Sequence, residues 1–241
     1  MSGHSKWNNI KNKKEKSDSQ RAKIFTKFGR EIAVAVKEGG ADPDANAKLR
    51  DVIAKAKANN VPNDNIDRML KKAAGETDKE YEEIVYEGYG PNGVAVVVET
   101  LTDNRNRTAG NVRHYFDKNG GNLGQNGSVM FMFERKGIII MNAEDLDEDT
   151  VMMDALDSGA DDFNADGDIF EITTDPNEVI NVATALQEKG YSFESAEAAY
   201  IPATTTTLTD EEHLFKMNRM LDMMEEDDDI QHVWHSWAQG E

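Results

Sequence analysis

Basic side chains crowd into the first thirty residues of a chain that is otherwise strongly acidic. The 241 residues carry a formal net charge of −19, yet residues 1–30 hold nine Lys or Arg against only Glu15 and Asp18. Residues 31–79 balance at nine basic and nine acidic, and residues 80–241 hold nine basic and thirty-five acidic. Local rather than total charge decides whether a surface engages a polyanion, so phosphate binding is expected near the N-terminus.

Lysine and arginine at this density can neutralise phosphates, with an affinity that falls as salt rises. Trp7 adds an aromatic stacking surface to the same segment. A solvated helix face with a charged tail is the alternative, and Trp7 could instead dock on a helical bundle. The candidate nucleic-acid-binding residues of this segment are Lys6, Trp7, Lys11, Lys13, Lys14, Lys16, Arg21, Lys23, Lys27 and Arg30.

A second candidate is the polar loop of residues 103–108, which leads into a predicted helix. Helix N-termini bind anions readily, and Arg105 and Arg107 are isolated cations in an acidic region. Pairing of these arginines with carboxylates of the same chain is at least as strong an alternative. Arg105 and Arg107 are therefore also candidate nucleic-acid-binding residues.

The remaining motifs favour structural roles. Residues 88–93 match G-x-G-x-x-G, but a strand follows them where a dinucleotide fingerprint needs a helix, so a hairpin turn is predicted. His232 and His235 would lie on opposite faces of a strand, which favours packing over metal binding.

Asp145, Asp147 and Asp149 resemble the start of an EF-hand, yet Thr150 replaces its glycine and Leu156 its bidentate glutamate. A solvated acidic helix start is preferred there. A weak cation site at Asp161, Asp162, Asp166 and Asp168 is disfavoured.

Neither catalysis nor a cofactor is supported by the sequence. It has no cysteine, no legible Ser-His-Asp arrangement and no P-loop, and its carboxylates are too dispersed to nominate an acid–base pair. No secretion signal and no run of about 18 apolar residues is present. We expect a cytoplasmic protein that is not an enzyme and needs no metal or cofactor.

Three amphipathic helices are predicted at the N-terminal end. The first runs from the caps at residues 17–19 to Gly39-Gly40, with an apolar arc opposite Lys23, Lys27, Arg30 and Lys37, which should form a solvent-facing basic stripe. Helices around residues 49–56 and 62–75 follow. A small bundle is expected.

From residue 81 onward the pattern changes to that of strands alternating with helices. Strands at 84–88, 94–100 and 128–134 surround a helix at 105–118, and a helix from Thr209 with a Thr209/Glu212 capping box and a strand at 230–238 complete that set. Between them, residues 137–201 follow the order βαββαβ, which is ferredoxin-like. Met217, Met220, Met223 and Met224 are best explained as core.

The predicted fold is α+β with three domains, the third inserted into the second. A helical basic domain covers residues 1–79, a discontinuous α/β domain covers 80–135 plus 204–241, and an inserted ferredoxin-like α/β domain covers 136–203.

Several motifs in this order closely resemble the YebC/PmpR family. They are Gly3-His4-Ser5-Lys6-Trp7, Lys23-Ile24-Phe25, Arg30-Glu31-Ile32, Gly39-Gly40-Ala41-Asp42-Pro43, Tyr86-Glu87-Gly88-Tyr89-Gly90-Pro91, the run from Leu101 to Thr108, and Gly127-Ser128-Val129. The resemblance covers nearly the whole chain, although its C-terminal third matches by architecture more than by motif. It implies a helical N-terminal domain followed by two interleaved α/β domains.

The resemblance also implies a probable transcriptional regulator that binds promoter DNA. Members of the family that act in mitochondria look like translational activators, and bacterial members are linked to ribosomes stalled on proline-rich nascent chains. A ribosome- or rRNA-associated translation factor that also meets basic ribosomal proteins is therefore the alternative, and an acidic protein–protein scaffold is the second alternative. No base-reading row of side chains is evident on a helix, and a Lys-rich arm with an aromatic residue suits irregular RNA. The oligomeric state is left open.

Overall fold

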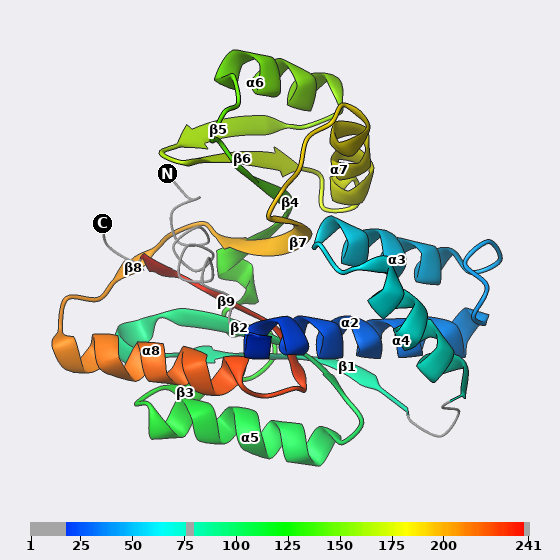
Figure 1. The fold of residues 1–241 in the computed structure, drawn as a ribbon. Helices are drawn as coiled ribbons and strands as arrows, with labels where there is room; N and C mark the ends of the chain where they lie inside the picture. Colours follow the sequence, from blue (N-terminus) through cyan, green and yellow to red (C-terminus); the bar gives the residue numbers. More distant parts are fainter. Residues whose placement is uncertain (1–17, 76–79, 239–241) are drawn as a thin grey trace. The chain divides into compact units, whose positions relative to one another are not determined.

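The computed structural model describes residues 18–75 and 80–238, with side chains from Lys23 onward (Figure 1). The chain divides into two compact units. Among the described residues, one unit consists of residues 18–30, 80–134 and 201–238, and the other of residues 31–75 and 135–200. The α+β class, with a helical N-terminal region and two further α/β domains, is confirmed. The three predicted domain boundaries stay a prediction.

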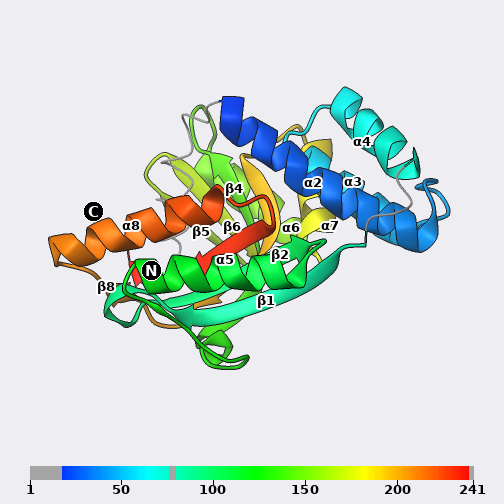
Figure 2. The ribbon, with the colours of Figure 1, turned by 90° about the horizontal axis from the view of Figure 1, so that it is seen from below.

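The first unit is built on an antiparallel sheet in the order β3-β1-β2-β9. Helices α5 and α8 lie side by side across one face of this sheet, as Figure 2 shows from below. The C-terminal segment also contains a separate two-stranded parallel sheet, in which β8 pairs with β10. The elements are β1 (Glu82–Tyr89), β2 (Ala95–Thr102), α5 (Arg105–Lys118), β3 (Asn122–Leu123), β8 (Thr206–Thr207), α8 (Glu211–Glu225), β9 (Ile230–His235) and β10 (Trp237–Ala238).

The core of this unit joins the alternate valines of β2 to the inner faces of both helices. Met217, Met220 and Met224 are fully buried in it, which confirms the core interpretation for these three, whereas Met223 is half-buried. The start of α8 differs from the prediction. Asp210, not Thr209, is the N-cap, and its carboxylate accepts hydrogen bonds from the backbone N–H groups of Glu212 and His213 at 2.9 and 3.1 Å.

The predicted strand at residues 128–134 is wrong. Met130–Met132 forms a 3-10 turn, η2, and the strand that follows is β4 (Phe133–Asn142), which also absorbs the predicted strand at 138–141. The physical reason is Glu87, whose carboxylate takes the backbone N–H groups of Val129 and Met130 that a strand would need for its ladder. The predicted closing strand at 230–238 is likewise interrupted at Ser236.

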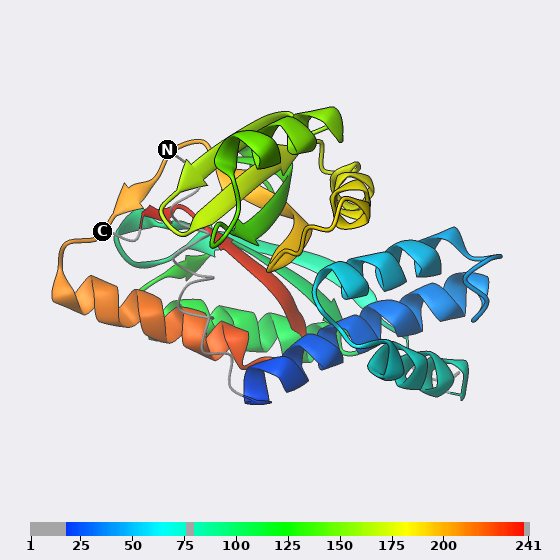
Figure 3. The same cartoon turned by 45° about the horizontal axis from the view of Figure 1, so that its top comes forward.

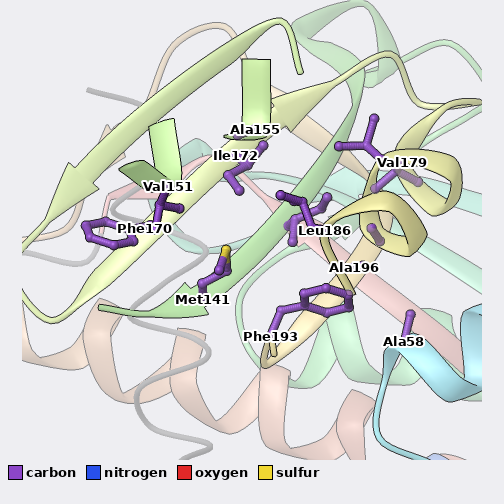
Figure 4. Close-up of a cluster of buried hydrophobic side chains, with 13 residues drawn as sticks. Ala58, Met141, Val151, Ala155, Phe170, Ile172, Val179, Leu186, Phe193 and Ala196 are labelled. Atoms are coloured by element: carbon purple, nitrogen blue, oxygen red, sulfur yellow. The ribbon is translucent and has the colours of Figure 1, made fainter. Parts of the chain in front are cut away.

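The second unit contains a four-stranded sheet in the order β5-β6-β4-β7, the arrangement expected of a βαββαβ ferredoxin-like chain. Helices α6 and α7 cover one face of it (Figure 3). Their apolar side chains meet those of β4 and β6, with Leu186 and Ile172 fully buried (Figure 4). The remaining elements are α6 (Glu148–Asp157), β5 (Asp162–Asp166), β6 (Ile169–Thr174), α7 (Val179–Glu188) and β7 (Ser195–Pro202).

The three N-terminal helices are α2 (Asp18–Gly39), α3 (Ala47–Ala58) and α4 (Asn63–Gly75), close to the predicted bounds. The apolar arc of α2 is packed, since Phe28, Ile32 and Ala35 are buried. Asn46 caps α3 by accepting from Leu49 N at 3.1 Å, and its amide also donates to the Ala35 carbonyl at 2.7 Å. This one buried side chain therefore joins the end of α2 to the start of α3. Across the described ranges, no helix is both long and apolar enough to cross a membrane.

Candidate nucleic-acid interface

The predicted phosphate ligands fall into two groups. Lys6, Trp7, Lys11, Lys13, Lys14 and Lys16 lie outside the described residues, and Arg21 lies in α2 with its side chain undescribed. Lys23, Lys27 and Arg30 lie on the first half of α2, where all three are half-buried. The described part of the candidate interface is therefore the first half of α2.

Two of these cations hold the first half of α2 to the rest of the first unit. The Lys27 ammonium donates to the Gln231 carbonyl at 2.7 Å, next to the start of β9. The Arg30 guanidinium donates to the Leu101 carbonyl and to Oδ1 of Asp229, each at 2.7 Å, and lies 5.5 Å from the centre of the Tyr81 ring. The basic helix is thus fixed on the C-terminal end of β2.

Asp229 is the centre of this network. Its side chain is 4% exposed and faces Arg30 at 2.7 Å and Arg107 at 2.8 Å. The Thr108 hydroxyl lies 2.7 Å from Oδ2 of Asp229, and the Thr102 hydroxyl lies 3.2 Å from the same atom. Burial acts to raise the pKa of Asp229, but the hydrogen bonds from Arg30, Arg107 and Thr108 outweigh it and lower the pKa to about 2. The carboxylate is therefore charged at neutral pH.

Arg105 and Arg107, the candidates from the polar loop of residues 103–108, are also paired within the chain. Arg107 bonds Asp229 and Asp103, and Arg105 donates to Glu82 at 3.0 Å. The alternative of internal pairing is thus the one that the structure supports. Arg105 is still 67% exposed and Arg107 46%, so each presents part of its side chain to solvent.

The expectation of a solvent-facing stripe along α2 is wrong for two of its members. Lys27 and Arg30 point at backbone carbonyls and a buried carboxylate, whereas Lys37 is exposed. A helical wheel places the residues on one face but cannot show that the start of β9 and the end of β2 lie against that face. Lys27 and Arg30 serve first to hold the helix.

The motifs with structural interpretations are explained by local geometry. Residues 88–93 form the β1–β2 hairpin, with Tyr89 paired to Ala95. Asp147 is the N-cap of α6 and accepts from the Thr150 N–H at 3.0 Å, which is the expected acidic helix start. His232 stacks on Trp234 with ring centres 5.2 Å apart, and burial lowers the pKa of His235 to about 4. Among described residues, no three His, Asp or Glu side chains gather as metal ligands would.

Sequence reasoning missed the role of Glu87. This buried carboxylate accepts hydrogen bonds from the backbone N–H groups of Gly127, Val129 and Met130 at 2.6, 2.9 and 2.7 Å. Burial acts to raise the pKa of Glu87, but these three donors outweigh it and the pKa lies below its ordinary value. An isolated glutamate inside a strand is the only signal in the sequence, and it does not identify the partner loop.

Charge is unevenly distributed among the α/β parts as well. Residues 135–200 contain seventeen acidic and three basic residues, a net charge of −14. By contrast, residues 118–133 contain no Asp or Glu and form the longest such stretch in the chain. Carboxylates that would repel a polyanion are therefore dense in residues 135–200 and absent from residues 118–133.

Comparison with known proteins places the chain in a family. Its residues 5–76 match the model of the TACO1/YebC protein N-terminal domain, and residues 81–237 match that of the TACO1/YebC second and third domain. Relatives named probable transcriptional regulatory protein occur in Acetivibrio thermocellus, with 59% identity over 98% of this chain and 99% of the relative, and in Finegoldia magna, with 58% identity over 98% and 99%.

A solved structure agrees with this placement. The crystal structure of a conserved hypothetical protein from Aquifex aeolicus is 43% identical, covers 91% of both chains and superposes with a TM-score of 0.78. The resemblance noted from the motifs is thereby confirmed over nearly the full length. This chain belongs to the TACO1/YebC family.

Proposed function

We propose that this protein is a nucleic-acid-binding regulator of gene expression that grips phosphates with its basic N-terminal segment. The observation that carries the proposal is charge segregation: residues 1–30 hold a net charge of +7, and residues 135–200 hold −14. Nonspecific phosphate binding scales with the number of cations that meet the backbone. The names of the relatives support a role in transcription, so promoter DNA is the first target to consider.

The anchoring of α2 supports the same proposal. Arg30 and Lys27 fix the first half of this helix to the ends of β2 and β9. A helix held at Lys27 and Arg30 carries Lys23, one turn earlier, on a fixed backbone, which lowers the entropic cost of binding through that residue.

A ribosome-associated translation factor is the second candidate, and the acidity of the inserted domain favours it. Its carboxylates complement basic proteins, and such proteins are abundant where structured RNA is packed. This candidate shares the phosphate-binding N-terminal segment with the first, so the two differ in target rather than in surface.

Crosslinking in cells, followed by sequencing of the bound nucleic acid, tests the proposal. We expect recovery of nucleic acid well above a control strain that carries the chain without residues 1–16. Enrichment of promoter DNA supports transcription, and enrichment of ribosomal RNA supports translation. Equal recovery with and without residues 1–16 contradicts the proposed use of this segment.

A further inference from the structure

Phe131 is the most exposed of the large apolar side chains described, at 78%. It lies in the 3-10 turn Met130–Met132, after a glycine-rich loop that follows β3. Scattered apolar residues on a surface need no explanation by themselves. This one is unusual because the backbone beneath it is held firmly.

The loop is fixed from several sides within its own unit. Glu87 accepts three of its backbone N–H groups at 2.6–2.9 Å, and the Tyr89 hydroxyl donates to the Ser128 carbonyl at 3.0 Å. Val129 is fully buried, and the Met132 carbonyl accepts from Ala203 N at 2.8 Å. The backbone that carries Phe131 is therefore already ordered before a ligand binds, so binding costs little further conformational entropy there.

The segment of sequence that carries Phe131 is poor in carboxylates, and the next one along the chain is the exposed Glu134. Phe131 lies in residues 118–133, the longest stretch of the chain without Asp or Glu. The carboxylate of Glu87 is buried beneath the loop and engaged by backbone donors. Within residues 80–241, which hold thirty-five acidic residues, this segment itself adds no exposed carboxylate that would repel a polyanion.

The exposed polar groups of the loop are amides. Asn122, Gln125 and Asn126 are exposed on the same segment. Amide side chains read the hydrogen-bonding edges of bases, and aromatic side chains stack on bases that are not held in a duplex.

We infer that residues 120–133 form a second nucleic-acid contact, in which Phe131 stacks on an unpaired base and the loop amides meet its edge. This inference rests on the proposed function and deepens it, because it specifies a target with accessible single-stranded bases. A fully paired duplex offers no base face for Phe131, whereas loops in RNA and melted DNA both do.

The test is a titration of the full-length chain with a labelled, unstructured single-stranded RNA, the single-stranded DNA of the same sequence, and the blunt duplex. Phe131→Ala should weaken binding to one or both single strands about tenfold and leave binding to the duplex unchanged. The matched control is Phe215→Ala, which removes a phenyl ring that is 64% exposed on α8 of the same unit. That control should leave the affinities for all three probes unchanged, and Phe131→Tyr should bind the single strands as the wild type does.

Stacking is observed directly with Phe131→Trp. Its added fluorescence should be quenched on titration with a single strand, whereas that of Phe215→Trp should not. The inference is overturned if Phe131→Ala binds both single strands as tightly as the wild type does. It is also overturned if the variant loses affinity equally for the single strands and the duplex. Loss of a protein partner with unchanged single-strand binding overturns it too, by making Phe131 a protein-docking residue. A wild-type chain that binds none of the probes contradicts the proposed function itself.

Discussion

The guanidinium of Arg30 donates a 2.7 Å hydrogen bond to Oδ1 of Asp229, which lies 199 positions later in the chain. Arg107, at the start of α5, bonds the same carboxylate. One acidic residue just before β9 thereby holds together the basic helix, the end of β2 and the start of α5. The run from Leu101 to Thr108, which is part of the resemblance to the family, supplies most of the partners.

Replacing Asp229 should destabilise the fold. Asp229→Ala leaves two guanidinium groups without their shared partner, and breaking a partly buried ion pair in this way costs about 3 kcal/mol. Asp228→Ala is the matched control, because Asp228 is the adjacent residue in the sequence and its carboxylate is exposed to solvent. Urea unfolding of both variants measures the difference, and equal free energies of unfolding would show that the network contributes nothing.

The Asp229 carboxylate should also make the free energy of unfolding depend on pH in the acidic range. Its pKa is lowered to about 2 in the folded chain and is about 3.9 when unfolded. The stabilisation is therefore complete above about pH 4 and is lost as the pH falls toward 2. Urea midpoints measured across this window should fall more steeply for the wild type than for Asp229→Asn, and parallel curves would argue against the assignment.

Glu87→Gln should loosen the loop that carries Phe131. The amide keeps one acceptor oxygen but turns an N–H₂ group toward backbone donors, so part of the set of three hydrogen bonds is lost. Hydrogen exchange at Gly127, Val129 and Met130 should accelerate by at least tenfold. Unchanged protection there would mean that Glu87 does not hold the loop. Exchange in α7 serves as the internal control.

Asp210→Ala should lower the free energy of unfolding by about 1 kcal/mol, because it removes the N-cap of α8. Thr209→Ala should cost much less, since Thr209 is not the cap. Thermal or urea unfolding of the pair measures this difference, and the reverse ranking would restore the capping box expected from the sequence.

Sequence patterns predicted the elements whose causes are local. The helix at 105–118 matches the structure, because Asn104 caps its first turn and its apolar spacing is regular. What the sequence could not show are partners far along the chain. Arg30 looks like a surface cation until Asp229 is placed beside it, and residues 128–134 look like a strand until Glu87 takes their backbone donors.

The central claim is that residues 1–30 bind nucleic-acid phosphates. The most direct measurement is a salt-dependent titration with Lys11, Lys13 and Lys14 changed to Glu, against a control in which the exposed Lys57, Arg68 and Lys71 are changed to Glu. Both variants alter the net charge equally. The first should bind at least tenfold more weakly, with a salt slope reduced by about three, and the control should stay near the wild type. Equal affinities for the two variants would contradict the account.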